Sequence, residues 1–181
     1  MHNKLCKNAK GNKPFGFTGY ISAALIAAAL TPLADASSNM KKIKLWDSIN
    51  SLTSIRTLQK KDVESTFGVR LRILAKRNEI VFYSSPTISL AEGGSIDSID
   101  FRVKNGSDPS SFLLVNLAGT CFLLADVRKL YNFDSISPPG AHAQNPTTSY
   151  SMKTEFGAAN FLFSYGAEKE CLTAVSLNFS G

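Results

Sequence analysis

The sequence predicts an α+β fold in which short helices pack on an antiparallel β-sheet. Two observations support this class. Short amphipathic helical segments precede the first strands, and the strand segments that follow are brief, alternate in polarity and are separated by turn residues such as Asn105-Gly106. The chain of 181 residues is 44% hydrophobic, which suffices for one domain or two very small ones and excludes a disordered chain.

Two helices are predicted near the start of this domain. Residues 60–68 predict one of them, because Val63 and Phe67 share a face and Gly68 stands where a left-handed residue commonly ends a helix. Residues 40–58 predict the other, since apolar side chains recur there at spacings of three or four: Leu45, Ile49, Leu52 and Ile55.

Four strand segments follow in the first half. Residues 69–73 alternate apolar and basic, so Arg70 and Arg72 are expected to point away from the core. They form either a cationic patch for an acidic partner or an ordinary solvated face. The other three segments are the runs 79–83, 99–103 and 112–117.

The start of the chain has the three parts of a secretory signal peptide. Residues 1–14 are basic and carry no acid, residues 15–33 are apolar, and Ala34-Asp35-Ala36 offers small residues where signal peptidase reads. An uncleaved membrane anchor is the alternative, but the densest apolar stretch is about half of the ~20 residues that a membrane-spanning helix needs. We therefore expect a signal peptide at 1–36 and a mature domain at 37–181, located in the periplasm without membrane insertion.

Removing the signal peptide lowers the net charge of the chain. Lys and Arg together fall from 20 to 16, because four lysines leave, and Asp and Glu together fall from 14 to 13. The net charge therefore drops from +6 to +3. No continuous Lys/Arg stripe remains, which argues against a nucleic-acid partner.

Two cysteines remain after cleavage, since Cys6 leaves with the signal peptide. In an oxidising compartment, Cys121 and Cys171 are expected to form a disulfide. It would close a loop of about 50 residues and stabilise the fold by about 4 kcal/mol in the chain-entropy model. A reactive thiol has no support, because neither cysteine has a neighbouring His or Lys that would lower its pKa.

The second half of the mature chain repeats features of the first. Residues 125–132 resemble 61–68: both contain Asp-Val, followed by an aromatic residue four positions after the Val and then by Asn or Gly. The strand pattern at 175–179 resembles the one at 99–103, which suggests twelve added residues in the second copy, placed at 134–148. We therefore expect either one domain or two tandem repeats, at 52–118 and 121–181.

These motifs resemble those of known exported proteins. A unit of short helices, with Asp-Val before a Phe-Gly turn and three or four strands, is similar to the BamE/SmpA family, and its tandem arrangement is similar to β-lactamase inhibitory proteins. The export signal, size and late cysteine pair resemble periplasmic immunity proteins of type VI secretion toxin pairs. The chain lacks the lipid-modified cysteine that BamE-like proteins carry after their signal sequence.

Residues suited to catalysis are sparse in the mature sequence. His142 is its only histidine and has no candidate nucleophile nearby in a loop rich in Pro and Gly. We find no G-x-S-x-G elbow, no zinc-ligand spacing and no phosphate-binding loop. The sequence therefore predicts a protein that is not an enzyme and has no catalytic, cofactor-binding or metal-binding residues. A small hydrolase that uses His142 or exposed carboxylates is the rival interpretation.

Binding to another protein has better support. The segment 134–148 is a long irregular stretch stiffened by prolines, and such loops in compact domains are often functional. Aromatic residues on a sheet are good interface anchors, although Phe161 and Phe163 are expected to be core. The predicted partner-binding residues are Arg70, Arg72, Pro138, Gly140, His142, Asn145, Tyr150 and Tyr165.

We therefore expect an exported binding protein that inhibits another protein. The favoured interpretation is an immunity protein that occludes the active site of a secreted toxin degrading the cell envelope, such as a peptidoglycan amidase. The alternatives are an envelope assembly or scaffold protein related to BamE and, less favoured, a small periplasmic hydrolase. The sequence leaves open whether the chain forms a homodimer.

Overall fold

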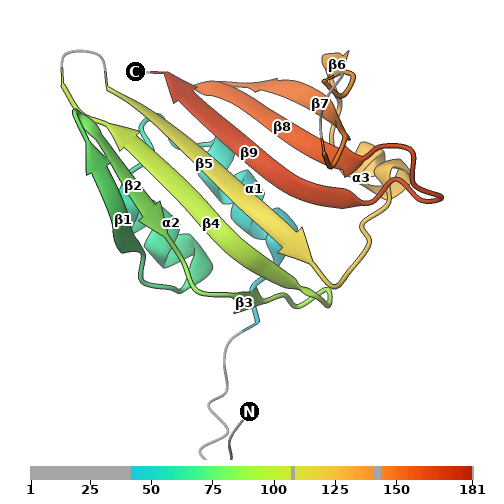
Figure 1. The fold of residues 1–181 in the computed structure, drawn as a ribbon, viewed down its shortest axis with the longest axis horizontal. Helices are drawn as coiled ribbons and strands as arrows, with labels where there is room; N and C mark the ends of the chain where they lie inside the picture. Colours follow the sequence, from blue (N-terminus) through green and yellow to red (C-terminus); the bar gives the residue numbers. More distant parts are fainter. Residues whose placement is uncertain (1–41, 107–108, 141–143, 181) are drawn as a thin grey trace, which may run out of the picture. The chain divides into compact units, whose positions relative to one another are not determined.

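The computed structural model describes residues 42–106, 109–140 and 144–180. The predicted α+β class is confirmed: within these residues, three short helices accompany a nine-stranded antiparallel sheet (Figure 1). The predicted signal peptide, residues 1–36, lies outside the described residues. No helix in the described part of the chain has the length and apolar character needed to cross a membrane.

The helices are α1 (Leu45–Thr53), α2 (Lys60–Phe67) and α3 (Leu124–Leu130). Helix α2 begins with a capping box and ends at Gly68, whose φ of 61° is the left-handed conformation that the sequence predicts there. Helix α1 is shorter than the predicted 40–58. Two residues that were predicted to be helical are not: Lys44 is extended, and Ile43 forms a parallel bridge with Leu90 at the sheet margin.

The sheet follows the order β1-β2-β4-β5-β9-β8-β7-β6, and β3 pairs with β4 beside this path. The bounds of the strands are β1 (Arg72–Arg77), β2 (Ile80–Ser84), β3 (Ile88–Ser89), β4 (Ser95–Lys104), β5 (Ser110–Ala118), β6 (Ser135–Ser137), β7 (Thr147–Thr154), β8 (Gly157–Ser164) and β9 (Leu172–Ser180). The first half of the domain thus supplies one side of the sheet and the second half supplies the other. The last strands of the two halves, β5 and β9, pair at its centre.

This order changes how the two halves compare. Strand β9 is the counterpart of β5 in the sheet, not of β4, which supplied the sequence match at 99–103. The starts of β5 and β9 are 172 − 110 = 62 residues apart, close to the 126 − 62 = 64 residues between the two Asp-Val pairs. The inferred addition of twelve residues is therefore wrong, whereas the duplication itself stays a prediction.

Three local predictions also differ from the structure. Residues 69–71 lie before β1, and the side chain of Ile73 is 55% exposed, because the strand is at the sheet edge and has a register shift after this residue. The predicted loop 134–148 contains β6 and the first residues of β7. Helix α3 ends on Tyr131 in an extended conformation, so Asn132 is not the left-handed cap that the repeat predicts.

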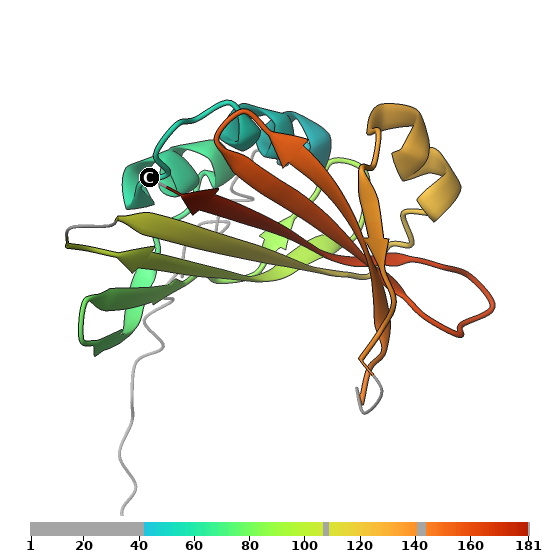
Figure 2. The same cartoon turned by 90° about the horizontal axis from the view of Figure 1, so that it is seen from above.

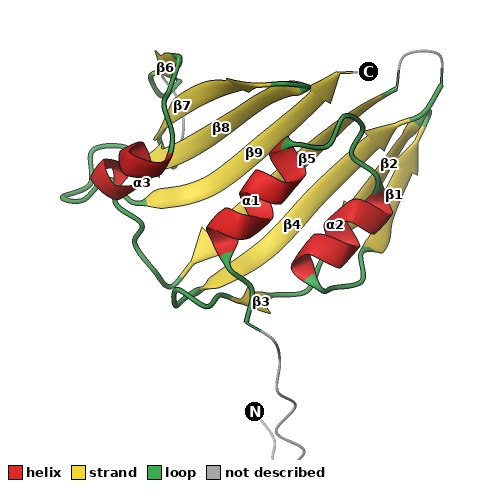
Figure 3. Ribbon diagram, turned by 180° about the vertical axis from the view of Figure 1, so that it is seen from behind, coloured by secondary structure: helices red, strands yellow, loops and turns green. Residues whose placement is uncertain are grey.

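The helices cover one face of the sheet. Figure 3 shows α1 and α2 in front of the central strands, and Figure 2 shows α3 on the same side. The buried side chains alternate along the strands, as in Leu113 and Val115 of β5 and Phe161 and Phe163 of β8, and face these helices. The predicted core positions of Phe161 and Phe163 are confirmed, since both are 0% exposed.

An aromatic cluster joins the helices to the second half of the sheet. The ring of Tyr131, at the end of α3, lies 4.7 Å from Phe161 and 5.9 Å from Trp46 of α1, measured between centroids. The Tyr131 hydroxyl donates a hydrogen bond of 2.9 Å to the Asn50 side-chain oxygen. Tyr131 thus ties α1, α3 and β8 together.

We expect stability to fall at alkaline pH because of Tyr131. Burial, together with the negative charge of Asp47, raises the pKa of Tyr131 to about 12. An unfolded tyrosine ionises near pH ~10. The contribution of the neutral Tyr131 to the free energy of unfolding is therefore fully present below about pH 10 and is lost as the pH rises toward 12. A difference of two units between the folded and unfolded pKa corresponds to at most about 2.7 kcal/mol.

Denaturant unfolding at several alkaline pH values, with the tyrosinate absorbance followed in parallel, checks this. The Tyr131→Phe variant should lose stability at neutral pH, because its Asn50 partner loses a donor, but should decline less between pH ~10 and ~12. An equal alkaline decline in both proteins would contradict the assignment to Tyr131.

Candidate functional site

The face of the sheet opposite the helices is the candidate functional site, and we call it the open face. In Figure 1 this face is toward the viewer, and the described helices lie behind it. Strand pairing places Phe82, Arg102, Phe112, Asn178, Ala158 and Lys153 in one row across it. Since side chains alternate between faces, Arg102 lies here because its neighbours Phe101 and Val103 face the helices.

Arg102 is the centre of a cluster of side chains drawn from four strands. Its guanidinium carbon lies 5.5 Å from the ring centroid of Phe82 and 5.1 Å from that of Phe112. The guanidinium carbon of Arg77 lies 6.0 Å from the same Phe82 ring. We call these four residues, with Asp100, the Arg102 cluster.

Asp100 orients the guanidinium of Arg102. The Arg102 Nε donates to both carboxylate oxygens, at 3.1 and 3.0 Å, and Nη2 donates to one of them. These hydrogen bonds raise the pKa of Arg102 above its ordinary value. The Arg102 side chain is nevertheless 45% exposed, so the cluster presents a fixed positive charge to solvent.

The open face is cationic as a whole. Among its described strand positions, five side chains are basic and two are acidic, which gives 5 − 2 = +3. The basic residues are Arg72, Arg77, Arg102, Lys104 and Lys153, and the acidic residues are Asp100 and Asp97, which is exposed at the register shift of β4.

The second half of the open face carries one charged strand residue, Lys153, and its Ser and Asn side chains hydrogen-bond to one another. Ser151 Oγ donates to the Asn160 side-chain oxygen at 2.6 Å, and Asn160 Nδ2 donates to Ser176 Oγ at 3.2 Å. These residues lie in the row that also contains Asp100 and Leu114. The two halves thus differ in chemistry, and the charge is concentrated beside the Arg102 cluster.

A groove crosses the open face next to this cluster. It has a volume of about 540 Å³. Arg102, Lys104 and Phe112 line one part of it, and Ala158 and Asn178 line another. The groove therefore combines positive charge, an aromatic ring and an amide, which suits a partner group that is anionic and partly apolar.

The structure separates the predicted partner-binding residues into two groups. Arg72 is on the open face, in the row that leads through Ser84 to Asp100, so it joins the region of the Arg102 cluster. Arg70 is exposed but precedes β1. Both arginines lie at the β1 edge of the sheet, and β6 forms the opposite edge. Seven strand spacings of ~4.8 Å separate β1 from β6, which is roughly 34 Å along the sheet.

The other predicted residues lie around the opposite edge. Pro138, Gly140 and Asn145 are exposed, and Tyr165 is 56% exposed. The Tyr165 backbone N–H donates to the carbonyl of Pro146 at 2.9 Å, which brings the end of the predicted loop against the turn after β8. His142 lies outside the described residues.

The expectation that Tyr150 lies near the sheet surface is wrong. Its side chain is 6% exposed, because β7 directs it toward the core, where its ring lies 5.4 Å from Phe163 and 5.3 Å from Phe133. Arg128 of α3 lies over this ring, 5.2 Å from its centroid. Tyr150 thus stabilises the fold rather than offering an interface.

Sequence reasoning missed the Arg102 cluster, although part of its signal was readable. The segment 112–115 is apolar at every position, which is unusual for a strand with one face in solvent. In the structure, Phe112 and Leu114 face away from the helices and are half-buried. Phe112 is an apolar residue at a strand position that points away from the core, and it pairs with Arg102. This apolar side chain on the outer face was the sequence signal for a binding surface.

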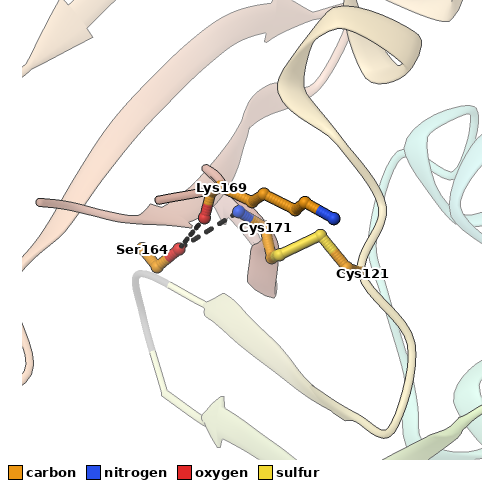
Figure 4. Close-up of a disulfide and its surroundings, with 4 residues drawn as sticks. All are labelled: Cys121, Ser164, Lys169 and Cys171. Atoms are coloured by element: carbon orange, nitrogen blue, oxygen red, sulfur yellow. Dashed lines mark hydrogen bonds between the residues drawn. A yellow bond between two sulfur atoms is a disulfide. The ribbon is translucent and has the colours of Figure 1, made fainter. Parts of the chain in front are cut away.

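The predicted disulfide is confirmed. Cys121 and Cys171 are bonded, with their Cα atoms 4.8 Å apart, and the bond joins the segment before α3 to the start of β9 (Figure 4). The Cys171 backbone N–H donates to Ser164 Oγ, which in turn donates to the Lys169 carbonyl. The disulfide is consistent with an oxidising compartment.

No match to this chain was found among protein-family models, curated proteins or solved structures. The family resemblances given above stay predictions. Among the described residues, no group of three or more His, Cys, Asp or Glu side chains is placed to hold a metal ion.

Proposed function

We propose that this chain is a periplasmic, non-enzymatic binding protein that inhibits a partner protein through the open face of its sheet. The observation that carries the proposal is a nine-stranded sheet with one face covered by helices and the other presenting the Arg102 cluster. Arginine and aromatic side chains on a rigid scaffold are the residues most enriched at the centres of protein interfaces. The sheet holds them in place, which lowers the entropic cost of binding.

The partner that we favour is a secreted toxin that degrades the cell envelope, such as a peptidoglycan amidase, so the chain would be an immunity protein. The predicted export signal and the disulfide both support action outside the cytoplasm. Inhibition would occur by occlusion: the open face covers the active cleft, and the exposed residues around Pro138 and Asn145 contact its rim.

Capture of the partner tests the proposal. The exported chain, purified from the periplasm with its disulfide oxidised, is incubated with the product of the adjacent gene. We expect a one-to-one complex in which the hydrolytic activity of the partner is abolished. Co-purification with outer-membrane components, and no hydrolase partner, would instead support an envelope assembly or scaffold protein. Hydrolysis by the chain alone that is lost when His142 is replaced would support an enzyme.

A further inference from the structure

We propose that the groove beside Arg102 binds a surface carboxylate of the partner protein, an Asp or Glu side chain on an acidic loop. This inference rests on the proposed function and specifies the chemistry of the partner. It concerns the first half of the open face, where basic side chains lie beside aromatic rings, and not the second half, where Ser and Asn side chains bond to one another.

The geometry of Arg102 prepares it for a second anion. Asp100 uses the Nε and Nη2 donors of the guanidinium, so the Nη1 hydrogens are not used by Asp100. Phe82 and Phe112 flank the group and restrict its rotation. An arginine held in this way loses little side-chain entropy when a carboxylate binds, and its planar donors match the two oxygens of a carboxylate.

The surroundings favour an anion over a cation. Arg77 reaches the same Phe82 ring from β1, and Lys104 lines the groove. The described strand positions of the open face carry a net charge of +3, as counted above, and one of their two acids, Asp100, is already bonded to Arg102. Phe112 offers an apolar surface for the methylene groups of a glutamate, which a free inorganic anion would not use.

A direct binding test needs no knowledge of the partner. The probe is a synthetic peptide with glutamate at alternate positions, titrated into the isotope-labelled exported chain and followed by NMR, including the arginine Nε–H signals. A peptide with glutamine at the same positions is the uncharged control. We expect the acidic peptide to shift signals of Arg102 and Phe112 and the uncharged peptide to bind at least 10-fold more weakly.

Matched variants separate a specific site from overall charge. Arg102→Gln removes one positive charge from the groove, and Lys129→Gln removes one from α3, on the helical side, where Lys129 is also paired with an acid, Asp126. We expect affinity for the acidic peptide to fall about 10-fold in Arg102→Gln and less than twofold in Lys129→Gln. Arg102→Lys, which keeps the charge but loses the planar donors, should bind about threefold more weakly than the parent.

Three results would overturn the inference. They are an equal loss of affinity in the two glutamine variants, peptide-induced shifts away from the groove, and a single-stranded oligonucleotide of equal charge bound as tightly as the peptide. Far-ultraviolet circular dichroism of each variant shows that it is folded. If the captured partner binds Arg102→Gln as tightly as the parent chain, this inference fails while the proposed function stands. If the peptide binds at the groove but no protein partner is captured, the proposed function fails.

Discussion

Replacing Phe161 by alanine is expected to lower the free energy of unfolding by about 3–5 kcal/mol. The Phe161 side chain is 0% exposed, and its ring lies 4.7 Å from Tyr131 and 5.4 Å from Phe133. Removing it loses buried apolar area and leaves a cavity where α3 meets the sheet. The neighbouring rings belong to separate elements and cannot all move inward to fill it. Urea denaturation followed by circular dichroism measures the change.

Tyr165→Ala is the matched control for Phe161→Ala. Tyr165 follows the same strand but is 56% exposed, so its replacement should change stability by no more than about 0.5 kcal/mol. A comparable loss in both variants would show that the aromatic cluster around Phe161 does not hold α3 on the sheet.

Strand alternation accounts for the positions that were predicted well. Phe161 and Phe163 are two residues apart in β8, so both face the helices, and their core positions follow from period-two alternation alone. The α2 helix and its Gly68 cap follow from equally local rules. In each case, the structure depends on residues that are neighbours in the sequence.

The predictions that failed depend on pairing between distant segments. Tyr150 lies in β7, and whether it faces the core is set by its register with β8, where it pairs with Phe161. The alternation at 69–73 does not reveal that β1 is an edge strand with a register shift between Ile73 and Ala75. A register shift of one residue reverses the face of every side chain beyond it, and polarity alone does not locate it.

The candidate site could not be predicted because it, too, depends on pairing between distant segments. Phe82, Arg102 and Phe112 come from three strands and meet only because β2, β4 and β5 are adjacent in the observed order. The sequence places Arg102 between two core-facing residues and so predicts that it points outward. It does not predict that two phenylalanine rings lie on either side of it, because that requires the register of both neighbouring strands.

Removing the Cys121–Cys171 disulfide is expected to destabilise the fold by about 4 kcal/mol. The two cysteines are 50 residues apart, and a cross-link of that span restricts the unfolded chain by about this amount in the chain-entropy model. Without the disulfide, backbone hydrogen bonds still join the segment before α3 to β9. The Leu172 N–H donates to the Phe122 carbonyl at 2.9 Å, and Leu123 forms an antiparallel backbone bridge with residue 171. The double variant Cys121→Ser, Cys171→Ser should therefore still fold, with a melting temperature lower by roughly 8–16 °C.

Thermal unfolding with and without a thiol reductant separates the cross-link from the effect of the substitutions. Reductant should lower the melting temperature of the parent chain to near that of the double variant and leave the double variant unchanged. Because the disulfide anchors the segment before α3, hydrogen exchange in the double variant should rise most in α3. Uniform acceleration throughout the sheet, with α3 no more affected than β4, would show that the cross-link acts only through the unfolded state and does not fix α3 on the sheet.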